Sequence, residues 1–159
     1  QSGEIDQVLV IPTAQHAFGK QPLANFNQRM EMCRLAFAEF AEGLMRVSDI
    51  ESRREGPSYT IDTAREILAA EPGTTLRLII GSDNVVDLEK WYRGKELLDV
   101  APPLVVPRTP QGGISPHPGA LPDISSTLIR QMLAHNELDK KLLSFRVIDY
   151  IRENGIYRS

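Results

Sequence analysis

Short apolar runs constrain the fold of this chain most, because each is followed by turn-forming residues or a helical pattern. The four runs are "QVLVIP" (7–12), "LMRVSDI" (44–50), "LRLIIG" (76–81) and "PLVVP" (103–107). Continuous apolar strands suit a sheet that is buried on both faces. Helical patterns predict helices over 26–42, 61–70, 85–88, 94–100, 126–135 and 142–153. This alternation predicts an α/β fold with a doubly wound parallel sheet and helices on both faces, in three α/β/α layers.

Length and charge limit the classes of protein to consider. A chain of 159 residues suits a single domain over 1–159, with a C-terminal helical part over about 124–159. A formal net charge of −3 argues against a general nucleic-acid binder or a membrane-surface binder. The single cysteine, Cys33, lies on the apolar side of a predicted helix and is interpreted as a core thiol. It cannot form an intrachain disulfide, so a cytoplasmic setting is the simplest expectation. The sequence leaves a homo-oligomer open.

Several common catalytic motifs are absent from the sequence. It contains no Cys-x-x-Cys, His-Glu-x-x-His, Walker-type phosphate loop, G-x-G-x-x-G or G-x-S-x-G. The three histidines, His16, His117 and His135, are scattered in loops or at a helix end. A zinc enzyme, a P-loop kinase and a serine hydrolase are therefore disfavoured, and no protein metal site is predicted.

Two stretches that follow predicted strands carry candidate ligand-binding residues, since ligands of open α/β sheets bind at the carboxyl ends of the strands. In "IPTAQHAFGK", Lys20 either meets a phosphate or is a solvated loop lysine. In "IIGSDNVVDLEKWY", Gly81 allows close approach of the backbone to a ligand. Asp83 either bonds ribose or adenine groups or caps the helix that starts near Asn84. Trp91 either stacks on a flat ring or belongs to the core.

A third stretch, "ISSTLIR", places hydroxyl side chains at the start of a predicted helix. Ser125, Ser126 and Thr127 stand where free backbone N–H groups and the helix dipole favour an anion. Arg130 lies one turn further and has a planar fork suited to phosphate. From local chemistry alone, a phosphate site and a merely capped helix with an exposed arginine are equally good interpretations.

Taken in order, these segments resemble bacterial nicotinate-nucleotide adenylyltransferases. The similar blocks are "SYTIDT" (58–63), "IIGSDNVVDLEKW" (79–91), "ISSTLIR" (124–130) and the ending "VIDYIRENGIYR". The resemblance covers nearly the whole chain and implies the Rossmann-like nucleotidyltransferase fold. It also implies an enzyme that joins nicotinate mononucleotide to AMP from ATP and releases pyrophosphate, with Mg²⁺ carried by the ATP phosphates. Alternatives are an adenylyltransferase acting on nicotinamide mononucleotide or another phosphate acceptor, and a non-catalytic nucleotide-binding remnant.

The resemblance also implies roles for particular residues. The ATP phosphates and the leaving pyrophosphate would be held by Ser125, Ser126, Thr127 and Arg130. The adenosine part would contact Gly81 and Asp83, with Ile124 flanking it. The pyridine ring would stack on Trp91, and its carboxylate would be positioned by Tyr59, Thr60 and the backbone near Tyr92. Lys20 would meet phosphate and, with Arg130, is the catalytic candidate. His16 is harder to assign, because Ala17-Phe18-Gly19 stands where Pro-Pro-His is expected.

The resemblance finally implies a His-x-Gly-His motif upstream of Gln1, whose histidines bind ATP phosphates. In the strand order 3-2-1-4-5 the first strand is central, so its neighbours would have unpaired backbone groups without it. Each such buried group costs about 1–3 kcal/mol, against a total stability of about 5–15 kcal/mol. We therefore expect an upstream βα unit of about 30 residues, and expect the 159 residues alone not to fold stably in this architecture.

Overall fold

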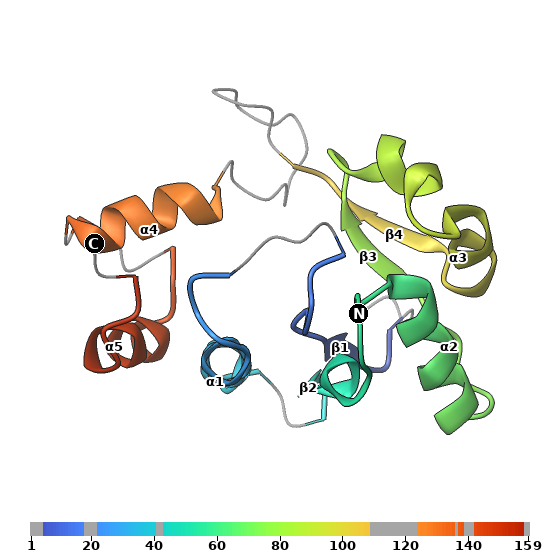
Figure 1. Ribbon diagram of the computed structural model, residues 1–159, viewed down its shortest axis with the longest axis horizontal. Helices are drawn as coiled ribbons and strands as arrows, with labels where there is room; N and C mark the ends of the chain where they lie inside the picture. Colours follow the sequence, from blue (N-terminus) through green and yellow to red (C-terminus); the bar gives the residue numbers. More distant parts are fainter. Residues whose placement is uncertain are drawn as a thin grey trace. The chain divides into compact units, whose positions relative to one another are not determined.

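The computed structural model describes residues 5–17, 22–40, 43–108, 124–135, 137–138 and 142–157. The chain forms two compact units (Figure 1). The first comprises residues 1–58 and 126–159, and the second comprises residues 59–125. The expectation of a single domain over the whole chain stays a prediction.

The first unit contains a parallel pair of strands. Strand β1 (Val8–Val10) pairs with β2 (Met45–Val47), with Val8 opposite Met45. The run 44–50 was predicted to be a strand throughout, but β2 ends at Val47 and the 3-10 helix η1 (Ile50–Arg53) follows. The reason is local hydrogen bonding, since Ser48 Oγ accepts from the Ile50 N–H at 3.3 Å and turns the chain out of the ladder.

The core of the first unit lies where α1 (Phe26–Phe37) meets α5 (Phe145–Glu153). Asn25 and Gln28 form a capping box, with both hydrogen bonds at 2.9 Å, and this box starts α1. The helix side that packs against the α5 cluster carries Met32, Leu35 and Ala36. The predicted extension of α1 to residue 42 is wrong, because the helix ends at Phe37. Phe40, which lies within the predicted extension, is 53% exposed.

The second unit contains a second parallel pair, with helices packed on one another. Strand β3 (Leu78–Gly81) lies beside β4 (Pro103–Val106) (Figure 1). Their register places Gly81 opposite Val106. The helices are α2 (Thr60–Ala70), the 3-10 helix η2 (Val85–Lys90) and α3 (Gly94–Val100). Its core cluster joins α2 to α3 through Ile61, Ala64, Leu97 and Ala101. Helix α2 has Tyr59 as its N-cap residue, and Tyr59 makes no side-chain cap bond.

The predicted α/β class is confirmed by these parallel pairs and the helices between their strands. The described strands form two two-stranded sheets, one in each unit, rather than one continuous sheet. Helix α4 (Ser126–Ala134) begins at the residue predicted from the sequence, and α3 matches its predicted bounds. None of the helices in the described part of the chain is long and apolar enough to cross a membrane. The expected upstream βα unit stays a prediction.

Candidate functional site

Arg108 joins three segments at the carboxyl ends of β3 and β4 in the second unit. Its backbone N–H donates to Ser82 Oγ at 3.1 Å. Its guanidinium donates from Nη1 to Asp83 Oδ2 at 2.7 Å and from Nη2 to the Ile124 carbonyl at 3.1 Å. The structure therefore brings together Asp83 and Ile124, two of the residues predicted to contact adenosine. The alternative that Asp83 caps η2 is wrong, because η2 has Asn84 as its N-cap residue, without a side-chain bond.

Gly81, the third predicted adenosine residue, lies beneath this ion pair. A Cβ atom added at Gly81 would collide with Asp83 Oδ1 and would approach Arg108 Cδ to 3.0 Å. The glycine is thus needed to let the two side chains of the protein cross over the end of β3. The prediction that it makes room for a ligand stays a prediction.

Aromatic rings form a second group in the same unit. The rings of Tyr59 and Tyr92 stack with their centroids 4.1 Å apart and their planes at 28°. Tyr92 is 52% exposed, whereas Trp91 is half-buried and packs against the α2–α3 core cluster. Thr60, half-buried, is the first residue of α2 and follows Tyr59 directly. The structure therefore brings together the tyrosines predicted to meet the pyridine substrate, and gives Trp91 a core contact as well.

The turn between η2 and α3 holds Tyr92 in place. Arg93 adopts a left-handed conformation with φ of 52°, and the Gly94 N–H donates to the Trp91 carbonyl at 2.8 Å. A Cβ atom at Gly94 would collide with the backbone carbonyl oxygen of Leu88. The close approach of η2 and α3 therefore requires glycine at this position, and it fixes where the chain presents Trp91 and Tyr92.

The third group lies at the start of α4 in the first unit. Ser126 and Thr127 are exposed in the first turn of the helix, and Ser125 precedes them. Arg130 Nη2 donates to Thr127 Oγ1 at 3.2 Å, and its guanidinium carbon lies 5.9 Å from the centroid of the Tyr157 ring. Among the described residues, no carboxylate pairs with Arg130. Its remaining N–H groups can therefore bind an anion at the helix N-terminus.

A helix end places Tyr157 beside Arg130. Gly155 follows α5 with φ of 61°, and the Ile156 N–H donates back to the Ile151 carbonyl at 3.0 Å. This arrangement buries Ile156 in the α1–α5 core and directs the next residue toward α4. Glycine at position 155 permits the left-handed backbone that ends this helix.

The loop after β1, which carries His16, is tied to the segment before α2. Ser58 Oγ accepts from the Gln15 N–H at 3.2 Å, the Ser58 N–H donates to the Gln15 carbonyl at 2.9 Å, and His16 and Ser58 form an isolated parallel bridge. Glu51, 8% exposed, accepts from the Ala14 N–H at 3.3 Å. Ser58 thus holds this loop instead of capping a helix. Lys20 lies outside the described residues.

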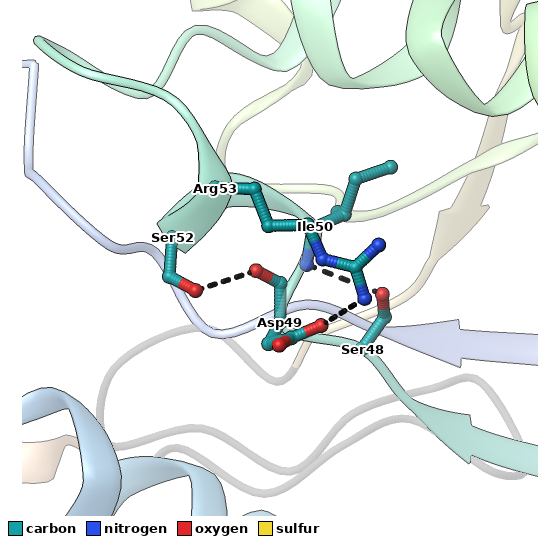
Figure 2. Close-up of polar contacts among 5 residues, drawn as sticks. All are labelled: Ser48, Asp49, Ile50, Ser52 and Arg53. Carbon is teal, nitrogen blue, oxygen red and sulfur yellow. Dashed lines mark hydrogen bonds and ion pairs between the residues drawn. The ribbon is translucent and has the colours of Figure 1, made fainter.

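Helix η1, which carries Glu51, is stabilised by contacts of its own (Figure 2). Ser52 Oγ donates to the Asp49 carbonyl at 2.8 Å, and Arg53 Nη2 donates to Asp49 Oδ1 at 2.6 Å. The hydrogen bond from Arg53 lowers the pKa of the Asp49 carboxyl below its usual value. These contacts shape the short helix from which Glu51 reaches the loop.

Sequence reasoning missed Arg108, Glu51 and Tyr157. Arg108 carried one available signal, since it directly follows the strand run "PLVVP" at the edge where ligands are expected. Tyr157 belongs to the ending "VIDYIRENGIYR", which resembles the family but assigned it no role. Glu51 carried no signal, because its contact with Ala14 joins segments distant in sequence. Within the described ranges, no group of three or more His, Cys, Asp or Glu side chains is placed to hold a metal ion.

Comparisons with known proteins identify the family. A family model described as "Cytidylyltransferase-like" matches residues 1–132. A protein of Anaeromyxobacter sp. (strain K), named "Probable nicotinate-nucleotide adenylyltransferase", is 40% identical over 159 residues, covering 97% of this chain and 82% of the relative. A protein of the same name from Myxococcus xanthus (strain DK1622) is 34% identical over 154 residues, covering 97% and 80%.

Solved structures agree on the fold. A Plasmodium falciparum nicotinic acid mononucleotide adenylyltransferase complexed with NaAD is similar with a TM-score of 0.76 at 20% identity, covering 99% of this chain and 85% of that one. At this identity the likeness establishes the nucleotidyltransferase fold, as the sequence predicted. The curated relatives, at 34% and 40% identity over most of both chains, show that the chain belongs to the nicotinate-nucleotide adenylyltransferase family.

Proposed function

We propose that this chain transfers AMP from ATP to nicotinate mononucleotide in NAD biosynthesis. A phosphate oxygen of the mononucleotide forms a bond to the α-phosphorus of ATP, and the bond from that phosphorus to the β-phosphate bridging oxygen breaks. The products are nicotinate adenine dinucleotide and pyrophosphate. No covalent enzyme intermediate is needed, so the protein acts by positioning the substrates and stabilising charge. The names and the 34–40% identity of the curated relatives support this reaction.

The arrangement at the start of α4 is the structural observation that carries the proposal. Two exposed hydroxyl residues, Ser126 and Thr127, follow Ser125 at a helix N-terminus, and Arg130 stands one turn away without a carboxylate partner among the described residues. Such a group is suited to a triphosphate and to the developing charge on a leaving pyrophosphate. We assign the phosphates of ATP to these four residues. Lys20 is assigned to phosphate on the resemblance alone.

The adenosine part of ATP is assigned to Gly81, Asp83 and Ile124. Asp83 supports this assignment by its exposure, since 45% of its side chain remains accessible next to the Arg108 ion pair. One carboxylate oxygen, Oδ2, accepts from Arg108, and Oδ1 has no hydrogen-bond partner in the described part of the chain. A ribose hydroxyl is a suitable donor to Oδ1.

The pyridine nucleotide is assigned to Tyr59, Thr60, Trp91 and Tyr92. The 4.1 Å separation of the two tyrosine rings leaves no room for a third ring between them. A pyridine ring would therefore stack on the outer face of a tyrosine ring or on Trp91. The hydroxyl groups of Tyr59 and Thr60 and the backbone near Tyr92 would bind its carboxylate.

Magnesium enters this proposal as part of the substrate MgATP. The described residues offer no carboxylate cage for it, and Mg²⁺ is commonly bound through substrate phosphates. The ion would offset phosphate charge during transfer. A cytoplasmic location is the natural setting for this reaction and belongs to the same proposal.

Steady-state rates with the acid and the amide mononucleotide test the choice of acceptor. At saturating MgATP, we expect a higher kcat/KM for nicotinate mononucleotide than for nicotinamide mononucleotide. The reverse preference would assign the chain to the amide acceptor. Absence of turnover with both, while ATP still binds, would favour the non-catalytic alternative.

A further inference from the structure

Hydrogen bonds of the backbone position Arg108 at the ends of strands β3 and β4, independently of its side chain. The Ser82 N–H donates to the Val106 carbonyl at 3.0 Å, which continues the β3–β4 ladder. The Arg108 N–H then donates to Ser82 Oγ. These two bonds determine where the Arg108 side chain leaves the ends of the strands.

The guanidinium bridges two segments that are distant in sequence. Nη1 donates to Asp83, which follows β3, and Nη2 donates to the Ile124 carbonyl, which lies two residues before α4. A planar fork holds two acceptors in a fixed relation, whereas a lysine ammonium has no fixed plane of donors. Arg108 therefore sets the position of Asp83 relative to the Ile124 carbonyl.

This bridge also determines how Asp83 meets a ligand. Because Arg108 takes Oδ2, the rotamer of Asp83 is restrained and Oδ1 is left as the acceptor. The positive guanidinium also offsets a carboxylate charge that would otherwise repel a triphosphate. Gly81 has no Cβ atom that would collide with Asp83 or crowd Arg108.

We infer that Arg108 is a positioning residue for the adenosine part of ATP, acting through Asp83 and the Ile124 carbonyl. The inference rests on the proposed function, because it takes ATP as the ligand of this group. It goes beyond that function by making recognition of the ribose hydroxyls depend on an arginine outside the predicted site.

The chain offers a matched control in Arg77, at the opposite ends of the same two strands. Arg77 Nε donates to the Pro102 carbonyl at 3.1 Å, and Nη2 donates to the Pro103 carbonyl at 3.0 Å. It is an exposed arginine that also bridges β3 and β4 with two side-chain hydrogen bonds. Replacing Arg77 removes a comparable pair of hydrogen bonds and leaves the carboxyl ends of the two strands intact.

The experiment compares Arg108→Ala, Arg108→Lys and Arg77→Ala in the complete natural protein. Isothermal titration measures the binding of MgATP and of its 2′-deoxy and 3′-deoxy analogues without acceptor, and thermal melting reports the fold. For Arg108→Ala we expect ATP binding weaker by about tenfold or more, the scale of a hydrogen bond to a charged group, and loss of the preference for ATP over at least one deoxy analogue. Arg108→Lys should recover part of the affinity but not the preference, and Arg77→Ala should keep both.

The outcomes separate this inference from the proposed function. An Arg108→Ala protein that retains the wild-type preference for ATP over both deoxy analogues overturns the inference, as does equal loss of affinity in Arg77→Ala. In either case dinucleotide synthesis by the wild type would leave the proposed function standing. A wild type that neither binds ATP nor makes dinucleotide overturns both.

Discussion

Replacing Gly81 by alanine should damage ATP binding while leaving the fold nearly unchanged. The new Cβ would collide with Asp83 Oδ1 and lie 3.0 Å from Arg108 Cδ. Both atoms belong to flexible side chains, so they can move aside. The loss of an exposed ion pair costs about 0.2–1 kcal/mol, which shifts the melting temperature of a chain of this size by at most about 4 °C.

The effect on the ligand should be larger than the effect on stability. Asp83 would leave the position in which Oδ1 can accept from ribose. A hydrogen bond to a charged group contributes about 1.5–3 kcal/mol, which corresponds to a roughly 10- to 150-fold weaker dissociation constant for MgATP. Isothermal titration measures this constant, and circular dichroism during heating measures the melting temperature.

Gly94→Ala should lower the stability of the fold more than Gly81→Ala does. Its Cβ would meet the backbone oxygen of Leu88 and approach the Glu89 carbonyl to 3.0 Å, and backbone atoms cannot move aside as readily. Overpacking of this kind costs about 1–3 kcal/mol, or about 2–12 °C in melting temperature. A Gly81→Ala protein that binds ATP as the wild type does would contradict the proposed role of Asp83, as would a fall in melting temperature as large as that of Gly94→Ala.

Three further predictions concern other parts of the molecule. Arg130→Ala should reduce turnover by about tenfold or more with the melting temperature preserved, and an unchanged rate would remove Arg130 from the site. Trp91→Ala should weaken acceptor binding by about 1–3 kcal/mol and also lower the melting temperature because of its core contact; unchanged acceptor affinity would leave Trp91 a core residue only. The pKa of the Asp49 carboxyl, followed by NMR titration, should lie below 3.8 and rise in Arg53→Ala. Because the pKa of Asp49 is lower in the folded state than in the unfolded state, the pairing with Arg53 stabilises the fold above the unfolded-state pKa. This contribution is lost as the pH falls through the folded-state pKa. An Asp49 pKa unaffected by Arg53→Ala would contradict the pairing.

Regular elements were predictable where the sequence pattern and the tertiary contacts agree. The α/β class, α3 and the start of α4 followed from apolar runs and helical spacing. The end of α1 did not, because an apolar residue at helical spacing need not be buried, and Phe40 is exposed. The end of β2 was missed because a single hydrogen bond from Ile50 to Ser48 outweighs the β-propensity of the run.

The sequence indicated which residues belong to the candidate site, but it did not indicate which of them contact one another. Hydroxyl residues before a helix and a glycine after a strand are local signals, so Ser126 and Gly81 could be singled out from the sequence. The contact of Asp83 with Arg108 joins residues 25 positions apart. Only the β3–β4 register brings these two together, since it places Gly81 opposite Val106. The roles of these residues toward ATP stay predictions.

Direct observation of the products tests the central proposal most closely. The complete natural protein is incubated with MgATP and nicotinate mononucleotide, and the dinucleotide and pyrophosphate are quantified by chromatography and by phosphorus NMR. The proposed reaction yields equal molar amounts of nicotinate adenine dinucleotide and pyrophosphate, and only when both substrates are present. Consumption of ATP without dinucleotide, or pyrophosphate released in the absence of the mononucleotide, would contradict it.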